Sequence, residues 1–273
     1  MTKCLRLLVC IAASFAAGLI SAQTPVLHYD FNEASAKSYP SQGSAKDAIA
    51  GKGDKQKAGD AGSGVSGKKA DRAWDATANT TAGAGTPANN SRLETAGSLA
   101  ALDSLEAFTV AMWFTSEQPL DSAVRLFGKT DSATKQTNGF VLRTYAPKKM
   151  NGKTAVELGI GDGKTRATLV SDYCDKGRGF NITGAKNKWV FLAVTWDGSM
   201  VRFYAGNTDE KVTVAGARSY KGKMAPATGK PLILGNTSGK NRGLDGKIDN
   251  FRIYNTALGL EQLELLRQSD AGQ

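Results

Sequence analysis

The chain contains a single histidine, His28, and acid–base chemistry would have to begin there. Its neighbours Leu27 and Tyr29 belong to a run of strand-forming residues, so a packed or edge position outweighs a role as general base. One histidine cannot form a His-metal cluster, and a Ser-His-Asp triad would have to use this residue. The sequence therefore gives little support to either kind of catalysis.

Carboxylate catalysis has one candidate pair. Glycoside hydrolysis needs two carboxyl groups about 5 to 9 Å apart across the scissile bond. Glu157 and Asp162, in VELGIGDG, lie on either side of a glycine-rich segment that predicts a turn. We therefore expect Glu157 to be a charged residue on a hairpin arm and Asp162 to be a turn residue. The segment GIGDGKT at 159–165 is similar to a phosphate-binding loop, but its spacing is wrong by one residue and no helical pattern follows. We interpret it as a β-turn.

The first 22 residues have the plan of a secretory signal. Basic residues precede the apolar run 7–20, and small residues end it. We expect cleavage after Ala22 and a single mature domain over 23–273, secreted, periplasmic or on the cell surface. No later segment approaches ~20 apolar residues, the length that spans a bilayer, so no membrane span is predicted.

Within the predicted mature chain Cys174 is the one cysteine, so no internal disulfide can form. It lies in SDYCDKGRGF between two predicted strands, with no histidine nearby in sequence. A partly buried bystander thiol is favoured over a nucleophile. Stability must then come from core burial, which ~250 residues can supply.

The elements that would position a site are predicted to be strands, and the clearest are in KWVFLAVTWDGSMVRFYAGN at 188–207. Two runs of β-branched and aromatic residues flank an Asp-Gly-Ser reversal at 197–199, which predicts a β-hairpin. The first arm is apolar on both faces, as in a strand buried between layers. The second arm alternates, and we expect its Arg202 and Tyr204 side to meet water.

Short strands separated by glycine and aspartate turns, with no interleaved helices, predict an all-β sandwich. A short terminal helix is predicted at 258–267. The segment 32–98 is poor in large apolar residues, and we expect extended loops and short strands anchored by Trp74, with a flexible insert as the alternative. Further strands are predicted at 26–31, 108–115, 124–127, 139–144, 155–160, 166–171, 211–215, 232–235 and 246–254.

Several segments carry a resemblance to a known family. After an opening HYDFNE come FTVAMWFTS, KWVFLAVTWDGSMVRFYAGN and LILGNTSGKNRGLDGKIDNFRIYNTALGLEQLELL, in this order. Over residues 26–267 the chain resembles a laminin-G-like jelly roll of the concanavalin A-like lectin/glucanase fold. The resemblance implies an antiparallel jelly-roll β-sandwich with ligands on a concave sheet or on rim loops. This architecture hosts lectins, adhesion domains, glycanases and lyases, so function must be argued from sites.

The resemblance also implies a structural calcium. In similar proteins, acids that match Asp30, after the first strand, and Asp249, in the last, often help hold Ca²⁺ near the sandwich edge. Calcium takes six to eight oxygen ligands, which carboxylates and loop carbonyls can supply. Alternatively, Asp30 caps a turn and Asp249 pairs with a lysine or arginine. A further acid, common in the family after the first strand, is replaced by YPSQG at 39–43. Additional candidate ligands are Asn32, Glu33 and Asp245.

Sugar binding usually requires an exposed aromatic ring beside planar polar groups. The tryptophans at 113, 189 and 196 lie in apolar strands and are expected in the core. Tyr145, Tyr173 and Tyr220 lie in polar, loop-like settings and are the ligand-binding candidates. Each has the alternative of an ordinary loop tyrosine.

The formal net charge is +10, with lysines spread along the chain and acids interspersed. A solvated surface is the plainer interpretation, and attraction to an anionic extracellular partner is the sharper one. Helix-turn-helix, zinc-finger and RNA-binding signatures are missing, so no nucleic-acid partner is expected.

These observations favour an exported carbohydrate-binding domain whose partner is a polysaccharide or glycoconjugate, including an anionic one, bound without turnover. Adhesion through protein contacts is the second class. A polysaccharide-degrading hydrolase or lyase is the third. Glucanases of the resembling fold typically carry Glu-x-Asp-x-x-Glu on one strand, and that string is missing here.

Overall fold

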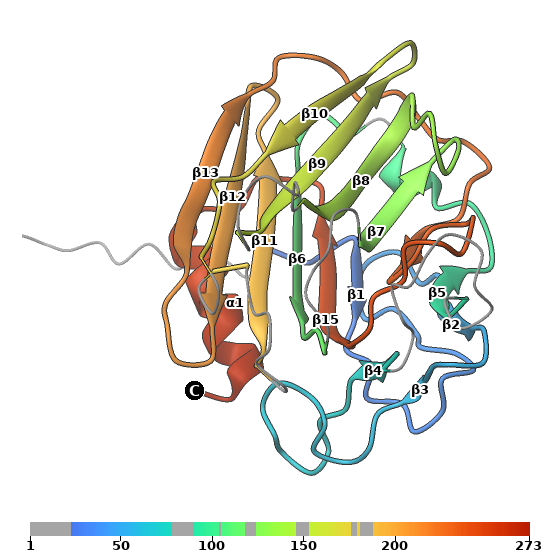
Figure 1. The fold of residues 1–273 in the computed structure, drawn as a ribbon, viewed down its shortest axis with the longest axis vertical. Helices are drawn as coiled ribbons and strands as arrows, with labels where there is room; N and C mark the ends of the chain where they lie inside the picture. Colours follow the sequence, from blue (N-terminus) through green and yellow to red (C-terminus); the bar gives the residue numbers. More distant parts are fainter. Residues whose placement is uncertain are drawn as a thin grey trace, which may run out of the picture.

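The computed structural model describes residues 23–77, 90–103, 105–117, 124–145, 153–175, 179–180 and 188–273. The predicted signal lies outside them. The described chain forms two antiparallel sheets and one α-helix (Figure 1). The eight-stranded sheet has the order β13-β12-β11-β6-β15-β4-β3, with β1 also paired to β15, and the seven-stranded sheet has the order β10-β9-β8-β7-β14-β5-β2. An antiparallel β-sandwich is thereby confirmed.

The elements follow the predicted runs closely. Their bounds are β1 Leu27–Tyr29, β2 Ile49–Lys52, β3 Lys57–Ala58, β4 Trp74–Asp75, β5 Arg92–Thr95, β6 Phe108–Phe114, β7 Arg125–Thr130, β8 Asn138–Tyr145, β9 Ala155–Asp162, β10 Arg166–Val170, β11 Val190–Trp196, β12 Met200–Asn207, β13 Thr213–Ser219, β14 Ile233–Leu234, β15 Lys247–Tyr254 and α1 Leu260–Ala271, with a 3-10 turn at Ala100–Leu102.

The hairpin predicted at 188–207 is formed by β11 and β12, and its surroundings explain why both faces of the first arm are apolar. Val190, Leu192 and Val194 belong to the core between the two sheets. Phe191 and Ala193, on the opposite face, belong to a second buried cluster that includes residues of α1. Strand β11 therefore sits between two apolar layers, as predicted, because a helix covers the outer face of its sheet.

The second arm corrects one expectation. Arg202 is half-exposed, but Tyr204 is only 4% exposed and belongs to the same outer cluster as Leu258 and Leu263. The terminal helix packs on this face of β12 and excludes water from it. Local alternation of polar and apolar residues could not reveal a cover that comes from about 55 residues further along the chain.

The outer face of the eight-stranded sheet also holds a buried ion pair. The Arg252 guanidinium on β15 donates from Nη1 to Asp270 Oδ2 (2.6 Å) and from Nη2 to Asp270 Oδ1 (2.7 Å). Trp113 Nε1 donates to the same carboxylate (3.1 Å). Burial lowers the pKa of Arg252, but the attraction of Asp270 outweighs it, and the pKa is raised overall. Helix α1 thus brings to this face a counter-charge as well as an apolar cover.

The glycine-rich segment 32–98 is anchored as predicted by Trp74, which is fully buried in the core. Its Nε1 donates to Gln56 Oε1 (3.0 Å). Gly235 adopts φ 73° beneath the ring, and a Cβ there would lie 2.6 Å from a ring carbon, so only glycine permits this approach. Residues 78–89 of the segment lie outside the described chain.

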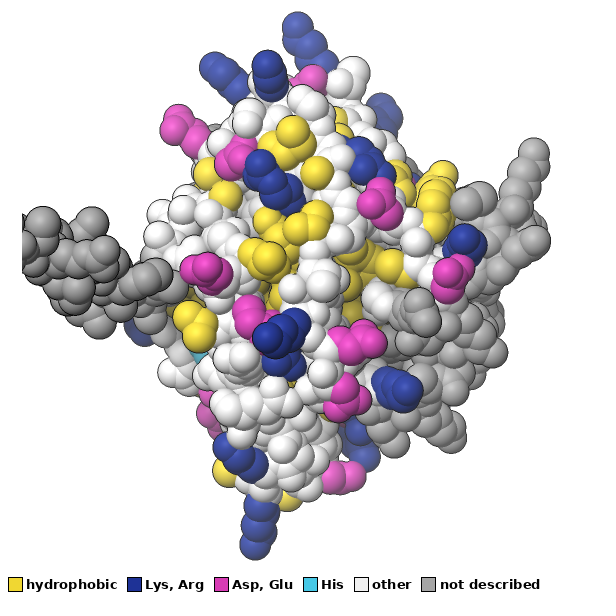
Figure 2. Space-filling view, turned by 90° about the vertical axis from the view of Figure 1, so that its left-hand side faces the viewer, with side chains coloured by type: hydrophobic (Ala, Val, Ile, Leu, Met, Phe, Trp, Pro, Cys, Tyr) yellow, Lys and Arg dark blue, Asp and Glu magenta, His cyan; other side chains and the backbone are white. Residues whose placement is uncertain are grey.

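Figure 2 shows the side of the molecule where β13 and α1 lie. Hydrophobic side chains gather in its middle, and positive and negative side chains are interspersed around them. This face has no concentration of one charge sign, in keeping with a solvated surface. Throughout the described residues, no helix combines the length and apolar character needed to cross a membrane.

Candidate functional site

The outer face of the seven-stranded sheet has a different composition. Strand pairing places Arg143 opposite Arg125 on one side and opposite Glu157 on the other, so these side chains share one face. Arg166 pairs with Gly161 and joins the same face, because Glu157, Gly159 and Gly161 alternate with core residues. The outer side of this sheet is therefore polar and rich in arginine.

Glu157 is held by two of these arginines. Arg143 donates from Nε to Oε1 (2.9 Å) and from Nη2 to Oε2 (2.7 Å), and Arg166 Nη2 donates to Oε1 (3.0 Å). The carboxylate is 1% exposed. Both of its oxygens accept charged hydrogen bonds, which favours a structural role over proton transfer.

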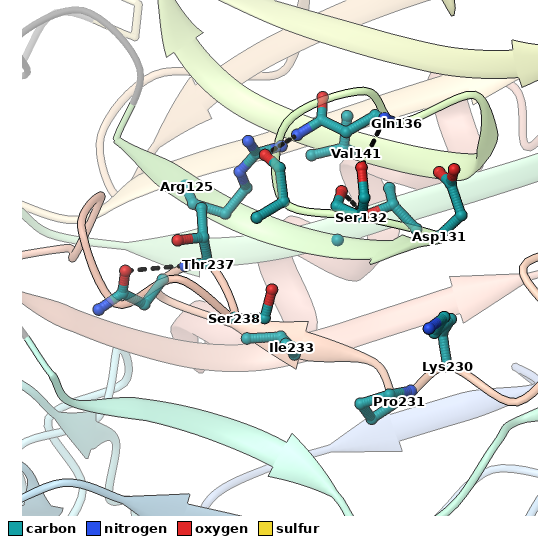
Figure 3. A pocket seen from close by; sticks show the side chains of 14 residues that line it. Arg125, Asp131, Ser132, Gln136, Val141, Lys230, Pro231, Ile233, Thr237 and Ser238 are labelled. Atoms are coloured by element: carbon teal, nitrogen blue, oxygen red, sulfur yellow. Dashed lines mark hydrogen bonds between the residues drawn. The ribbon is translucent and has the colours of Figure 1, made fainter.

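Next to this network lies a cavity of about 240 Å³ (Figure 3). Its walls come from β7, β8, the turn between them and the segment 230–238, which contains β14. Figure 3 shows Arg125 reaching up from β7 toward the level of Gln136, with Asp131 and Ser132 across the turn and Lys230 and Thr237 on other walls. The volume is below the ~300 Å³ at which drug-sized pockets begin, so it suits one compact polar group or ring.

Arg125 is the unusual residue of this cavity. It is 5% exposed, and its Nε and Nη1 have no hydrogen-bond partner among the described residues. Burial, followed by the positive charges of Arg143 and Arg166, lowers the pKa of Arg125 to about 9. The guanidinium still carries its charge at neutral pH, so the cavity contains a desolvated cation with unused donors.

The remaining walls are polar and held in place. Gln136, 3% exposed, donates from Nε2 to Ala133 O (3.0 Å), and its Oε1 accepts a hydrogen bond from Arg166 Nη1. Its backbone has φ 54°, a left-handed conformation that non-glycine residues rarely adopt and that occurs often at functional sites. Across the cavity, Asn236 Oδ1 accepts the backbone N–H of Thr237 (2.8 Å). The cavity is thus preformed by its own hydrogen bonds.

A wider hollow, of about 610 Å³, lies beside Lys55, Gln56 and Asp75. Four side-chain atoms of the described residues are buried without a partner, and they belong to Tyr39, Arg125 and Asp249. None of these residues lines the wider hollow. The Arg125 cavity is the better candidate site, because an unpaired buried donor is what a ligand can satisfy.

Comparison with known families identifies the architecture. A family profile for the concanavalin A-like lectin/glucanases superfamily matches residues 80–264. The chain belongs to this superfamily. Its laminin-G-like jelly roll, expected from the sequence, is thereby confirmed. Among curated protein sequences none matches the chain.

Solved structures show the same fold at low sequence identity. Domain 4 of an extracellular arabinanase from Geobacillus stearothermophilus, solved in complex with arabinotriose, is 18% identical with a TM-score of 0.56, over 90% of this chain and 98% of that domain. The botulinum neurotoxin serotype G binding domain is 12% identical with a TM-score of 0.60, over 90% of this chain but 51% of its own length. The binding domain of Paraclostridial Mosquitocidal Protein 1 is 12% identical with a TM-score of 0.56, over 88% and 53%. This chain spans about half of each toxin domain.

In this superfamily member, two of the three predicted tyrosines lie together. Tyr145, at the end of β8, and Tyr173 have ring centroids 6.5 Å apart, and Tyr173 is 38% exposed. Tyr145 is on the outer face with Arg143, because it alternates with the buried Thr144. Tyr220 lies elsewhere: its ring packs 5.6 Å from Trp196, and its hydroxyl donates to Lys223 O (2.9 Å).

The two predicted calcium ligands lie on neighbouring strands. Asp30 follows β1, which pairs with β15, the strand that carries Asp249. Asp30 Oδ1 accepts the N–H of Asn32 (3.3 Å), which is the turn-capping alternative. Asp249 is fully buried; its Oδ2 accepts the N–H of Val65 (2.8 Å), while Oδ1 has no partner among the described residues. Burial and the charge of Asp71 raise the pKa of Asp249 well above its ordinary value.

The part of the chain that the structure describes holds no group of three or more His, Cys, Asp or Glu side chains placed to share a metal ion. Asp249 Oδ1 fits a cation as one ligand, and the other oxygens would have to come largely from backbone carbonyls and water. Calcium at this position remains a prediction.

The other chemically suggestive residues occupy structural positions. His28 Nε2 lies 3.1 Å from Asn250 Oδ1, and burial lowers the pKa of His28. Burial raises the pKa of the half-buried Cys174 thiol, so the thiolate is disfavoured. Asp162 accepts the backbone N–H groups of Lys164 (2.8 Å) and Thr165 (2.7 Å), so GIGDGKT is a β-turn as predicted.

Sequence reasoning missed Arg125 and Gln136. The available signal was the arginine itself, a charge inside the apolar run AVRLFG. A charged residue in a predicted buried strand requires either a partner or a functional explanation.

Proposed function

We propose that this protein is an exported glycan-binding domain that holds one sugar unit in the Arg125 cavity, on the outer face of the seven-stranded sheet, without turnover. The observation that carries the proposal is the guanidinium of Arg125, which lines a preformed polar cavity and has two buried nitrogens without a partner among the described residues. The arabinanase domain with the same fold was solved with arabinotriose, which supports a saccharide as the class of ligand.

The lining suits a sugar ring. The lining includes four hydroxyl-bearing residues, Thr130, Ser132, Thr237 and Ser238, together with Val141 and Gly128. Hydroxyls both donate and accept hydrogen bonds, as sugar hydroxyls do, and an apolar wall accepts the C–H face of a ring. This combination of a few fixed polar groups with an apolar surface is typical of small-ligand sites.

A longer glycan would extend along β8. Val141, Arg143 and Tyr145 alternate on the outer face, so the Tyr145–Tyr173 pair lies about 13 Å along the strand from the cavity. Aromatic rings at that distance would stack on a later unit of the same chain. Tyr145 and Tyr173 are therefore proposed as a second contact, and Tyr220 only as a candidate for a separate one.

The first experiment is a glycan array probed with the purified protein. Ser238→Trp, a substitution at an exposed residue of the cavity rim, should abolish the signal because the indole would fill the cavity. Ser219→Trp, at an exposed serine of β13 in the other sheet, is the matched control and should bind as the wild type does. An empty array would redirect the assignment to adhesion through protein contacts. Equal binding by both variants would place the glycan elsewhere on the protein.

The absence of turnover is tested separately. Bound polysaccharides are incubated with the protein and assayed for reducing ends and for unsaturated products. Since Glu157 is held by Arg143 and Arg166, no sustained release is expected. Sustained release of either product would overturn the non-enzymatic assignment in favour of a hydrolase or lyase.

We also propose, as a structural cofactor, a calcium ion ligated by Asp249 Oδ1, with Asp30, which directly follows the neighbouring strand β1, as the second candidate ligand. Support comes from the unpartnered buried oxygen and from the proximity of Asp71, whose charge a cation would offset. Bound calcium would keep Asp249 deprotonated and join β15 to the loop that contains Val65.

A further inference from the structure

We propose that Arg125 is an anion receptor that binds the carboxylate or sulfate group of an acidic sugar directly, so that the cavity selects acidic glycan units over neutral ones. This inference rests on the proposed glycan-binding function and adds its specificity-determining residue. It differs from general attraction to a basic protein, because it depends on one side chain and not on the net charge.

Arg125 carries a buried positive charge that no carboxylate of the described residues binds. Arg125 is 5% exposed, and the two buried nitrogens Nε and Nη1 lack partners among the described residues. A neutral sugar hydroxyl could accept their hydrogen bonds but would leave the positive charge uncompensated in a poorly solvated site. An anionic oxygen satisfies both the donors and the charge.

The charges around Arg125 are mostly positive. The charged groups that act on Arg125 are Arg143, Arg166 and Arg242, which are positive, and Glu157, which is negative. Glu157 already binds two of those arginines. The carboxylate that lines the cavity, Asp131, accepts hydrogen bonds from Thr137 Oγ1 (2.9 Å) and the Asn138 N–H (3.1 Å). The local balance favours an incoming anion.

The two other buried arginines of the described residues each have a carboxylate partner. Arg252 is 8% exposed and is bound through two nitrogens by Asp270; Arg267 is 3% exposed and is bound by Glu264 at 2.9 Å. Where this fold buries an arginine for stability, it supplies a carboxylate. Arg125 is buried to a similar degree, but its Nε and Nη1 have no partner among the described residues, and Asp131, which lines the same cavity, is held by Thr137 and Asn138. Its counter-ion is therefore expected to arrive with the ligand.

The test is biolayer interferometry of the purified protein on paired polysaccharides: polygalacturonate, alginate and hyaluronan, each beside its carboxyl-reduced form, and dextran sulfate beside dextran. The first three pairs test a carboxylate and the last a sulfate. Charged hydrogen bonds discriminate by about tenfold or more, so the wild type should bind at least one acidic member of a pair at least about tenfold more tightly than its neutral counterpart.

The variants are Arg125→Met, Arg125→Lys and Arg202→Met. The first removes the charge and should bring the acidic and neutral members of a pair within about twofold. The second keeps the charge and should retain part of the preference for the acidic polysaccharide. It provides an independent test if the methionine variant folds poorly. The third removes an equal charge from Arg202, on β12 of the other sheet, and should keep the full preference.

Equal binding of acidic and neutral members by the wild type would overturn this inference while leaving glycan binding intact. An acid preference that persists in Arg125→Met would also overturn it, since the preference would then come from the general surface charge. Binding of no polysaccharide, together with an empty glycan array, would overturn the proposed function and this inference with it.

Discussion

The outer face of each sheet has a buried arginine, and the two arginines differ in whether a carboxylate binds the guanidinium. On the eight-stranded sheet, α1 covers the strands and Asp270 binds Arg252 through both oxygens, which raises the pKa of Arg252 despite its burial. On the seven-stranded sheet, Arg125 is equally buried, but burial and neighbouring arginines lower its pKa to about 9. Folding completes the first site and leaves the second to be completed by a ligand.

This difference separates stability from function. Replacing a buried charge that has a partner lowers the free energy of unfolding, because the partner is left buried and unpaired. A buried charge without a partner itself destabilises the folded state. Residues in binding sites commonly reduce the stability of the folded protein, because their side chains are arranged to contact the ligand and not to stabilise the fold. The comparison predicts opposite stability effects for the same substitution at the two arginines.

The largest effect is expected at the paired arginine. Arg252→Met leaves Asp270 buried without its cation and should lower the free energy of unfolding by about 3–5 kcal/mol, measured by urea denaturation. Arg218→Met, which breaks an exposed pair with Asp172, is the control and should change stability by less than about 1 kcal/mol. Similar small losses in both variants would show that α1 covers the sheet without the ion pair contributing.

The second effect concerns Asp249, whose Oδ1 has no partner among the residues that the structure describes. We expect Ca²⁺ to bind Asp249 Oδ1, much as an anionic ligand would bind Arg125. At a concentration of ~100 times its Kd, calcium should then increase the free energy of unfolding by about 2.7 kcal/mol. The melting temperature should rise with CaCl₂ and fall back with chelator. Asp249→Asn should lose the response. A wild-type melting curve unaffected by metal or chelator would remove calcium from this protein.

A third effect, of opposite sign to the first, is expected at the unpaired arginine. Arg125→Met replaces a desolvated cation by an apolar side chain of similar length and should raise the free energy of unfolding by about 1 kcal/mol. Urea denaturation of the ligand-free protein measures it. A loss of stability instead would mean that the guanidinium has a partner in solution, and the contrast between the two faces would disappear.

The smallest effect is expected for an exposed pair. Arg202 Nη1 donates to Asp197 Oδ2 (2.7 Å), and this bond, with that from Ser199, lowers the pKa of Asp197 below its ordinary value of 3.8. Arg202→Met should cost about 0.5 kcal/mol at pH 7. Because the folded-state pKa is depressed, this contribution is present above pH 3.8 and declines as the pH falls through the folded-state pKa. A difference that is constant from pH 7 to pH 2 would contradict the assignment.

Much of the fold was predictable because it is encoded locally. The run of β11, which is apolar on both faces, predicts a strand between two apolar layers. The Asp-Gly-Ser segment at 197–199 predicts the turn of the hairpin. Trp74 was recognisable as an anchor because it and Val65 are the only large apolar residues within residues 51–91. The placement of Tyr204 failed for the converse reason, since its cover is a helix from a distant part of the sequence.

The candidate site was only partly predictable. Tyr145 and Tyr173 were found by residue type, and the structure brings them together, but their role as a ligand contact stays a prediction. The calcium pair Asp30 and Asp249 came from family resemblance, and the structure adds Asp71, which no spacing pattern connects to them.

By itself the sequence determined the secondary structure, the layered architecture and the superfamily, because alternation of apolar residues and turn chemistry act over a few neighbouring positions. The three-dimensional arrangement was needed to show that Asp270 binds the Arg252 guanidinium, while Nε and Nη1 of Arg125 have no partner among the described residues. That difference depends on the register of β7 against β8 and on the return of the segment 230–238 from about a hundred residues away. Electrostatic pairing is a property of distances in space, and a linear pattern does not contain them.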